Sequence, residues 1–451
     1  MKNYSTSPTD QNAVELLKSN PLGRNNAIFR FLQLIDSIDD SCSIALNGEW
    51  GSGKTIFTKQ IKLIMDYNNP QSSLSNDLRE SMASIGMQIP ECANYSTVYY
   101  DAWANDDNDD PILSLVYATI ASEQSNYSPE NVRSLSGLVS KIFDAVTARP
   151  ISDILEQFKG EDPFAHVKTR ENIHALIHGF LDELILERGN RLVFFVDELD
   201  RCRPAYAIQL LERIKHYFDD ERVTFVFSVN LTQLQHAVKS YYGYFFDSTR
   251  YLDKFFDLRI SLPEIDYRRF IEYKFSFLSS GYIYDEICVR VAQYFSFTLR
   301  EVERYMRLIR IAAYTKSHNH GEASFSRQKA LQFGLLYLVP VMIGLSMSDM
   351  EAYSKFIAGE NFDVLCKVLS CMTDYTYQDW LGIRKADHTD IDSAVMERIK
   401  EVYHAVFADT GNKYRANFET RVGEMSFTEQ TRQEIMNIAT LLAPCAEYDF
   451  S

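Results

Sequence analysis

The sequence predicts an α/β fold, a doubly wound and mainly parallel sheet, followed by a separate all-helical domain. Three observations predict it. Five short apolar runs of strand length alternate with helical segments in residues 1–263. A glycine-rich turn follows the first of these runs and opens a helix. In residues 264–451 the hydrophobic pattern is helical, so we expect a domain boundary just after Pro263.

The first strand is expected at residues 43–47. A helix within residues 20–38 precedes it, because apolar side chains there recur at helical spacing after a Pro-Leu-Gly turn. From Thr55 onward, apolar residues again share one helical face. Residues 68–95 are polar and rich in Asn, Ser and Pro, which predicts a peripheral loop insertion.

The second strand is expected at residues 96–102. An acidic run, 105–110, follows it, and Pro111 then opens a helix, because proline suits the first helical turn. A mostly helical pattern continues over residues 115–189. The last three strands are continuous apolar runs, which predicts burial on both faces: 192–196, 224–229 and 258–262.

The second domain contains strong helical patterns near residues 266–280, 298–314, 326–347 and 428–443. Residues 330–347 are almost continuously apolar over about the ~18 residues that could cross a membrane. Gln332 lies near the start of this stretch, Pro340 divides it, and its flanks lack a basic bias. We therefore expect a buried, kinked helix rather than a membrane span.

The composition excludes several classes of protein. The chain has 46 Lys and Arg against 62 Asp and Glu, a net charge of −16, which disfavours sequence-independent binding of nucleic acid. The seven cysteines form no CxxC pair and do not cluster with the nine histidines, so neither a zinc site nor disulfides are expected. No apolar segment follows a basic start at the N-terminus, and we expect a cytoplasmic protein.

The glycine-rich turn matches the P-loop pattern G-x-x-x-x-G-K-[ST], in which backbone N–H groups and a helix N-terminus surround phosphates. Lys54 is expected to reach the β and γ phosphates of ATP, and the hydroxyl of Thr55 to bind Mg²⁺. The nucleotide-binding segment comprises Gly48, Glu49, Trp50, Gly51, Ser52, Gly53, Lys54, Thr55 and Ile56.

Two carboxylates end the strand at 192–196, at the sheet edge where ligands bind in open α/β folds. Adjacent strand residues point to opposite faces, so we expect different roles for them. Asp197 would hold Mg²⁺ through water, and Glu198 would orient or deprotonate the attacking water. Asp200 is a competing candidate for the catalytic base.

Other polar residues are candidates for sensing the nucleotide. Asn230 ends the strand at 224–229, where its side chain could contact the γ-phosphate or the attacking water. Arg300 could reach over the phosphates from the second domain, and the same helix carries Arg304 and Arg307. An arginine finger from a neighbouring subunit would stabilise transition-state charge, and its candidates are Arg201, Arg203 and Arg250.

The segment Asp197-Glu198-Leu199-Asp200-Arg201-Cys202-Arg203-Pro204 closely resembles the Walker B signature of the KAP family of P-loop NTPases. The P-loop itself and four other stretches agree in order and spacing: Leu22–Arg24, Tyr100–Trp103 with Asp109–Pro111, Tyr251–Phe256 and Leu262–Pro263. The resemblance covers roughly residues 20–310. Two positions depart from the family pattern, Asp101 where asparagine is usual and Glu198 where aspartate is frequent, and neither change damages the expected chemistry.

This resemblance implies an ASCE/AAA+-like sheet and places Leu22, Gly23 and Arg24 near the adenine. Many members carry transmembrane helices between the two Walker motifs, but residues 56–190 contain no such run, which implies a soluble member. Several prokaryotic members act in phage exclusion. We therefore expect a Mg²⁺-dependent ATPase that works as a nucleotide-driven assembly switch, as a homo-oligomer, with a protein partner or effector encoded nearby. The alternatives are a nucleotide-gated scaffold with little turnover and, ranked last, a small-molecule kinase.

Overall fold

The computed structural model of the chain describes residues 8–85, 92, 94–108, 110–123, 137–143, 145–146, 165–275, 282–313, 328–369, 381–383, 391–407 and 419–440. The chain forms two compact units, Met1–Glu264 and Ile265–Ser451. Each unit has its own buried apolar core.

A five-stranded sheet organises the first unit, and every neighbouring pair of its strands is parallel. The strands are β1 (Cys42–Asn47), β2 (Tyr95–Asp101), β3 (Arg191–Asp197), β4 (Val223–Val229) and β5 (Leu258–Ser261). Their order, β2-β3-β4-β1-β5, places β4 between β1 and β3. The predicted parallel α/β sheet is confirmed, and the segments after β1 and β3 flank the end of β4.

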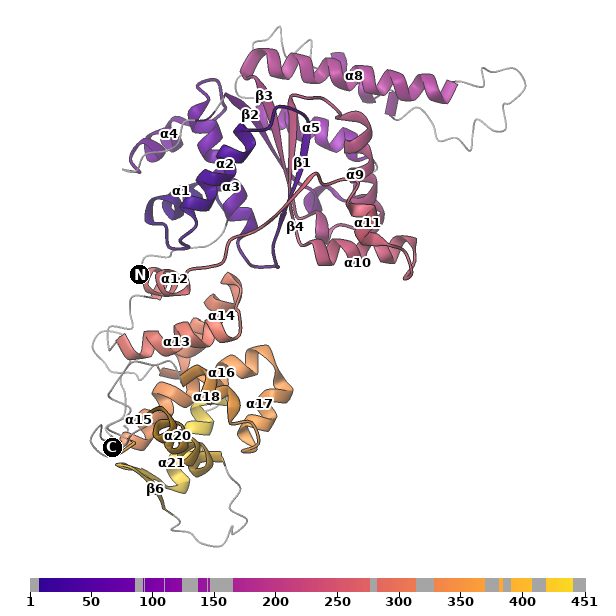
Figure 1. Ribbon diagram of the computed structural model, residues 1–451. Helices are drawn as coiled ribbons and strands as arrows, with labels where there is room; N and C mark the ends of the chain where they lie inside the picture. The colour runs from indigo at the N-terminus through magenta and orange to yellow at the C-terminus, as the bar shows by residue number, and fades with distance from the viewer. Residues whose placement is uncertain are drawn as a thin grey trace. The chain divides into compact units, whose positions relative to one another are not determined.

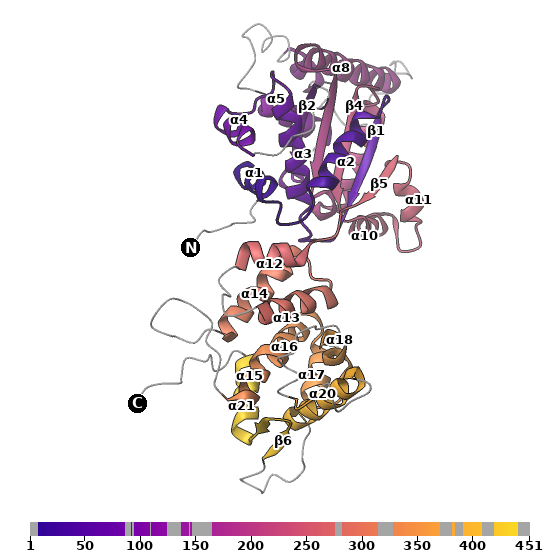
Figure 2. The ribbon, with the colours of Figure 1, turned by 60° about the vertical axis from the view of Figure 1, so that its left-hand side comes forward.

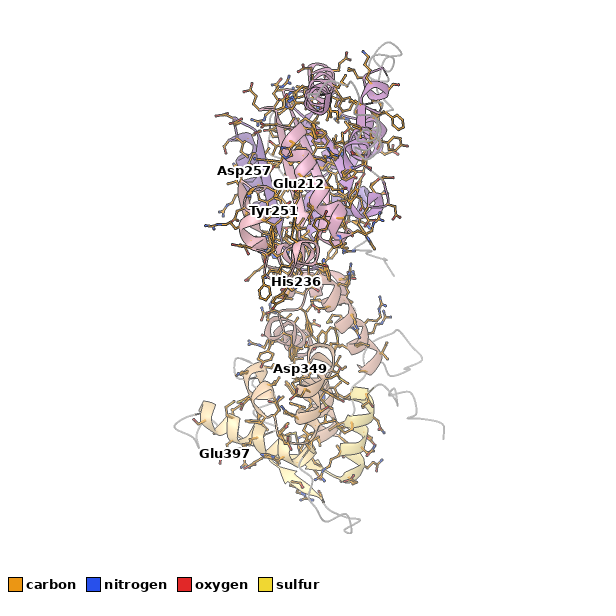
Figure 3. The ribbon with its side chains drawn as sticks, turned by 90° about the vertical axis from the view of Figure 1, so that its right-hand side faces the viewer. Glu212, His236, Tyr251, Asp257, Asp349 and Glu397 are labelled. Atoms are coloured by element: carbon orange, nitrogen blue, oxygen red, sulfur yellow. The ribbon has the colours of Figure 1, made fainter. Side chains whose placement is uncertain are left out.

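Helices cover both faces of the sheet, as Figure 1 shows with the strands nearly edge-on. The core on one face includes side chains of α1 (Asp10–Ser19), α2 (Asn25–Asp36) and α3 (Lys54–Asn68). The core on the other face includes side chains of α5 (Pro111–Glu123), α8 (Ala165–Arg188), α9 (Pro204–Tyr217), α10 (Leu231–Tyr242) and α11 (Ser248–Leu252). Because strand residues alternate, Val193 and Phe195 join the first core while Phe194 and Val196 join the second. The helix α11 is fastened to α9 by the Tyr251 hydroxyl, which donates to Glu212 Oε1 at 2.9 Å (Figure 3).

The structure corrects three expectations for the first unit. The helix α1 was not predicted, and the supposed loop insertion at 68–95 contains the helix α4 (Asn76–Ala83). The strand expected at 258–262 ends at Ser261 and is not buried on both faces, since its residues alternate between intermediate and exposed. Among the described strands it pairs only with β1, at the edge of the sheet.

The described residues of the second unit are helical apart from a small antiparallel hairpin, which was not predicted (Figure 2). Its helices are α12 (Tyr267–Phe275), α13 (Tyr282–Tyr294), α14 (Leu299–Ala313), α15 (Lys329–Phe333), η3 (Gly334–Leu338), α16 (Val339–Ser348), α17 (Met350–Ile357), α18 (Asp363–Leu369), α20 (Ile391–Phe407) and α21 (Glu429–Thr440). The hairpin comprises β6 (Thr420–Val422) and β7 (Met425–Phe427).

The long apolar stretch forms one helical run, Lys329–Ser348. Within the described part of the chain this is the one helix long and apolar enough to cross a membrane, and 83% of its apolar 18-residue window is buried inside the structure. The helix is interrupted at Gly334–Leu338 by a π-helical turn just before Pro340. A π turn widens the helix locally and is a recognised cause of kinks.

Candidate functional site

Hydrogen bonds from both neighbouring strands fix the beginning of the glycine-rich loop. The Gly48 N–H donates to the carbonyl oxygen of Val229 at 3.1 Å, and the Leu262 N–H donates to that of Asn47 at 2.7 Å. The side-chain oxygen of Asn47 also accepts a bond from the Leu231 N–H at 2.9 Å. The loop therefore starts from a point where three strand ends are joined.

The three glycines of the loop are required for two different reasons. Gly51 and Gly53 have φ angles of 80° and 93°, which residues with a Cβ atom rarely adopt. At Gly48 the constraint is space, because a Cβ atom would lie 2.9 Å from Ser52 Oγ and 3.2 Å from Leu262 Cβ. The backbone thus has the curvature expected of a phosphate-binding loop.

Lys54, the first residue of α3, is buried against this loop. Its Nζ donates to the carbonyl oxygens of Gly48 at 2.6 Å and Glu49 at 3.1 Å. Burial lowers the pKa of Lys54, and the carboxylates of Asp200 and Asp197 oppose this effect. The ammonium therefore lies inside the loop, close to the carboxylates that follow β3.

Thr55 and Ile56 continue the first turn of α3. Thr55 is partly exposed beside the loop, whereas the side chain of Ile56 is buried in the core. Of the two, Thr55 therefore has the side chain that can bind a ligand. The N-terminal end of α3 adds its backbone N–H groups and positive dipole to the loop.

Asp197 ends β3 and is almost completely buried. Its Oδ2 accepts a hydrogen bond from the Tyr99 hydroxyl at 2.8 Å, and its Oδ1 accepts one from the Glu198 N–H at 2.9 Å. Ser228 pairs with Asp197 in the sheet register, and its buried hydroxyl has no hydrogen-bond partner in the described structure. Sequence reasoning missed Tyr99 and Ser228, although a serine within the apolar run 223–229 was a usable signal.

Glu198 does not lie on the strand, which corrects the expectation that it would alternate with Asp197. Its φ of 58° places it in a left-handed turn before the short helix η2 (Leu199–Arg201). The carboxylate of Glu198 pairs with Arg201, with 2.8 Å between Oε2 and Nη1. Burial raises the pKa of Glu198, and Arg201 opposes that shift.

Asp200 faces the glycine-rich loop rather than Arg201. Its buried Oδ2 accepts a hydrogen bond from Trp50 Nε1 at 2.5 Å, which joins the loop to η2. Among the three carboxylates of this segment, Asp200 acts most strongly on the Lys54 ammonium and Glu198 least. Glu198 and Asp200 therefore occupy different sides of the site, and both remain candidates for the base.

Arg24 and Asn230 both bond to backbone groups, Arg24 in the glycine-rich loop and Asn230 at the start of α10. Buried Arg24 donates from Nη1 to the carbonyl oxygen of Ser52 at 2.9 Å, and Gly23 precedes it with a φ of 70°. Asn230 is the N-cap of α10, because its Oδ1 accepts from the N–H groups of Thr232 at 3.1 Å and Gln233 at 3.2 Å. The amide NH₂ of Asn230 is the group that could reach a phosphate.

The candidate arginines are held in different ways. Arg201 lies over the ring of Trp103, 5.4 Å from its centroid, in addition to its pairing with Glu198. Arg203 pairs with Asp106 and Asp107. Arg250 is exposed on α11. The remaining three, Arg300, Arg304 and Arg307, are on α14 in the second unit, and their roles remain predictions.

A parallel sheet with a P-loop after β1 and a buried aspartate at the end of β3 defines a P-loop nucleoside triphosphatase fold. The model of the KAP family P-loop domain matches residues 24–315, more than half of the sequence, and the chain belongs to this family. The match continues past Glu264 through α14, so the family domain includes the first helices of the second unit. None of the curated proteins searched matches the chain.

Proposed function

We propose that the chain binds ATP with Mg²⁺, hydrolyses it, and uses the nucleotide to control its own assembly. The observation that carries the proposal is the convergence of two segments at one edge of the sheet. Lys54, buried in the loop after β1, lies within the electrostatic influence of Asp197, Glu198 and Asp200, which end β3 or follow it. This arrangement supplies a phosphate-binding cation and carboxylates that can bind a metal ion and activate water.

The residues present fit Mg²⁺, with Thr55 and Asp197 as the groups that would hold it. Protein sites for Mg²⁺ typically use one or two carboxylates together with water and substrate phosphates. When bound, Mg²⁺ would neutralise charge that develops on the phosphates. The Tyr99 hydroxyl orients the carboxylate of Asp197 for this role.

Two carboxylates are available to orient or accept a proton from the attacking water. Glu198 follows Asp197 directly and pairs with Arg201, whereas Asp200 is buried and bonded to Trp50. The role of base requires the carboxylate to reach the water. We assign it first to Glu198, with Asp200 as the competing candidate.

The assembly switch and its context extend this proposal. Membership of the KAP family supports nucleotide binding. We extend the proposal to antiviral defence because several prokaryotic members of that family act in phage exclusion. In this proposal ATP closes the helical second domain, 264–451, onto the domain 1–263, and Arg300 reports which nucleotide is bound. Hydrolysis resets the assembly in the cytoplasm, and a protein partner or effector receives the signal.

The proposal is tested by steady-state ATP turnover of the purified chain, with oligomer size measured by mass in each nucleotide state. We expect Lys54→Ala to lose ATP binding, because the phosphates lose their buried cation. Glu198→Gln should retain binding, lower turnover by about 10²- to 10⁴-fold, and accumulate as a larger assembly. Asp200→Asn, measured in parallel, should bind ATP and lose less turnover than Glu198→Gln.

Three outcomes would change the assignment. If Asp200→Asn stalls and Glu198→Gln does not, Asp200 is the base. If the wild type binds ATP tightly without turnover, the chain is a nucleotide-gated scaffold that works through protein partners. If the wild type does not bind ATP, the proposal fails entirely.

A further inference from the structure

The guanidinium of Arg201 lies between a carboxylate and an aromatic ring. Its Nη1 is 2.8 Å from Glu198 Oε2, and its central carbon is 5.4 Å from the centroid of the Trp103 ring. About a quarter of the Arg201 side chain remains exposed, compared with 52% of Trp103. Cation–π contacts of this kind restrict where a guanidinium can move.

The backbone brings these three residues together. The Ala102 N–H donates to the carbonyl oxygen of Asp197 at 3.0 Å, which holds the end of β2 beside the end of β3. Trp103 follows directly in the short helix η1 (Trp103–Asn105). On the other side, the Arg201 N–H donates to the carbonyl oxygen of Glu198 at 3.0 Å and closes the η2 turn. The side chains therefore meet because of hydrogen bonds that do not involve them.

Glu198 needs such a contact because its surroundings are acidic. The carboxylates of Asp197, Asp101 and Asp200 are close enough to repel it. The carboxylate would turn toward solvent unless a cation held it, and Lys54 acts on Glu198 less strongly than on Asp200 or Asp197. Arg201 supplies that cation, and Trp103 supports the guanidinium from the side.

We propose that Arg201 is a positioning residue for Glu198 within its own chain, and that Trp103 holds Arg201 in place for this role. The inference rests on the proposed hydrolysis, in which Glu198 acts on water. It assigns Arg201 a role different from that of an arginine finger, which must reach the phosphates of a neighbouring subunit. A guanidinium already engaged by Glu198 and Trp103 would first have to abandon both contacts.

The kinetic test compares Arg201→Gln, Arg201→Lys and a matched control. We expect Arg201→Gln to lower kcat about 10- to 100-fold while KM changes little, because misplaced catalytic groups cost rate rather than binding. Arg201→Lys should restore part of the loss, since it keeps the charge. Arg213→Gln is the control, because Arg213 also combines an aromatic contact, with Tyr217, and an ion pair, with Asp110, but away from Glu198. Loss of rate in the control equal to that in Arg201→Gln would overturn the proposal.

A double-mutant cycle shows whether Arg201 acts through Glu198. If it does, Arg201→Gln causes no further loss of turnover in the Glu198→Gln background. Multiplying losses would indicate an independent contact with the nucleotide and would overturn the proposal. A mixing experiment tests whether Arg201 acts between subunits. Lys54→Ala chains, which keep Arg201, are added to Arg201→Gln chains, and we expect no recovery of ATP turnover. Restoration would identify Arg201 as a finger acting between subunits.

A measurement without nucleotide separates this inference from the proposed function. In a chain whose Trp50 and Trp380 are replaced by phenylalanine, Trp103 alone reports the contact by its fluorescence. We expect Arg201→Gln to shift this emission and Arg213→Gln to leave it unchanged. If the wild type has no ATPase activity but the emission responds, the proposed function fails while the contact stands. If the emission does not respond, the contact is absent and the inference fails whether or not ATP is hydrolysed.

Discussion

Contacts between residues far apart in the sequence assemble the site. The bond from Trp50 to Asp200 spans 150 residues, and that from Arg24 to Ser52 spans 28. Each joins the glycine-rich loop to another segment. They add to the bonds within the loop itself, which Lys54 and Ser52 donate to the carbonyl oxygens of Gly48 and Glu49.

Asp285, on α13 in the second unit, should make stability depend on pH. Its Oδ1 is buried without a hydrogen-bond partner in the described structure, and burial, with the nearby charge of Glu272, raises its pKa to about 6 despite Arg268. Between pH 4 and 6 the folded chain therefore holds a proton that the unfolded chain has lost. The free energy of unfolding should fall as pH rises through this interval, and the penalty is complete above pH 6.

Asp285→Asn removes this penalty because the amide is never charged. We expect it to raise the free energy of unfolding at pH 7.5 by about 1 kcal/mol, a value reduced for solvent screening of a partly exposed group. The advantage should disappear near pH 4. Denaturant unfolding at both pH values measures it, with Glu397→Gln on the surface of α20 as control (Figure 3). An equal gain at both pH values would contradict the titration of Asp285.

In the second unit, the π-helical turn packs so closely on α21 that one added methyl group should lower stability. Gly334 begins the π-helical turn, and a Cβ atom there would lie 2.5 Å from Cγ1 and Cδ1 of the buried Ile435 on α21. The close approach of the two helices therefore depends on a residue without a side chain.

Gly334→Ala should lower the free energy of unfolding by about 1 to 2 kcal/mol. The cost of overpacking, ~1 to 3 kcal/mol, exceeds the gain of up to ~1 kcal/mol from the better helix propensity of alanine. Gly137→Ala is the matched control, since Gly137 is exposed in a helix with nothing within 4 Å of its added Cβ. Denaturant unfolding should show no loss for the control. A neutral Gly334→Ala would mean that α21 can move away from the π turn.

Element boundaries were predictable where the local pattern was strong. The boundaries of β1 to β4 were predicted within one residue, because strands buried in a parallel sheet are mostly apolar. Burial of β5 on both faces was predicted wrongly. Its place at the edge follows from the order of the strands in the sheet, which the local sequence does not show. The helix α1 was missed, and the hairpin β6–β7 is too short for periodicity to indicate.

At the scale of the whole molecule, binding of a nucleotide should raise the free energy of unfolding of the first unit. A ligand that binds only the folded state adds about 2.7 kcal/mol when present at 100 times its Kd. Hydrogen–deuterium exchange of β1 and β4, measured with and without Mg²⁺ and ATP, should therefore slow by up to about 100-fold. Lys54→Ala should show no slowing. Equal protection in the variant would mean that ATP binds elsewhere.

The sequence by itself determined the class of this protein. The P-loop after β1, the acidic segment after β3 and the alternation of strands with helices are local patterns, because backbone curvature and strand burial depend on neighbouring residues. The family match over residues 24–315 confirms the resemblance that these motifs indicated.

Only the tertiary structure decided how the site is held. It placed Glu198 in a left-handed turn against Arg201, directed Asp200 toward Trp50, and put Tyr99 and Ser228 beside Asp197. These relations depend on the strand order, which brings β2 and β4 to either side of β3. A linear pattern cannot specify them, because hydrogen bonds and ion pairs between distant segments form only once the sheet has set which strand ends are neighbours.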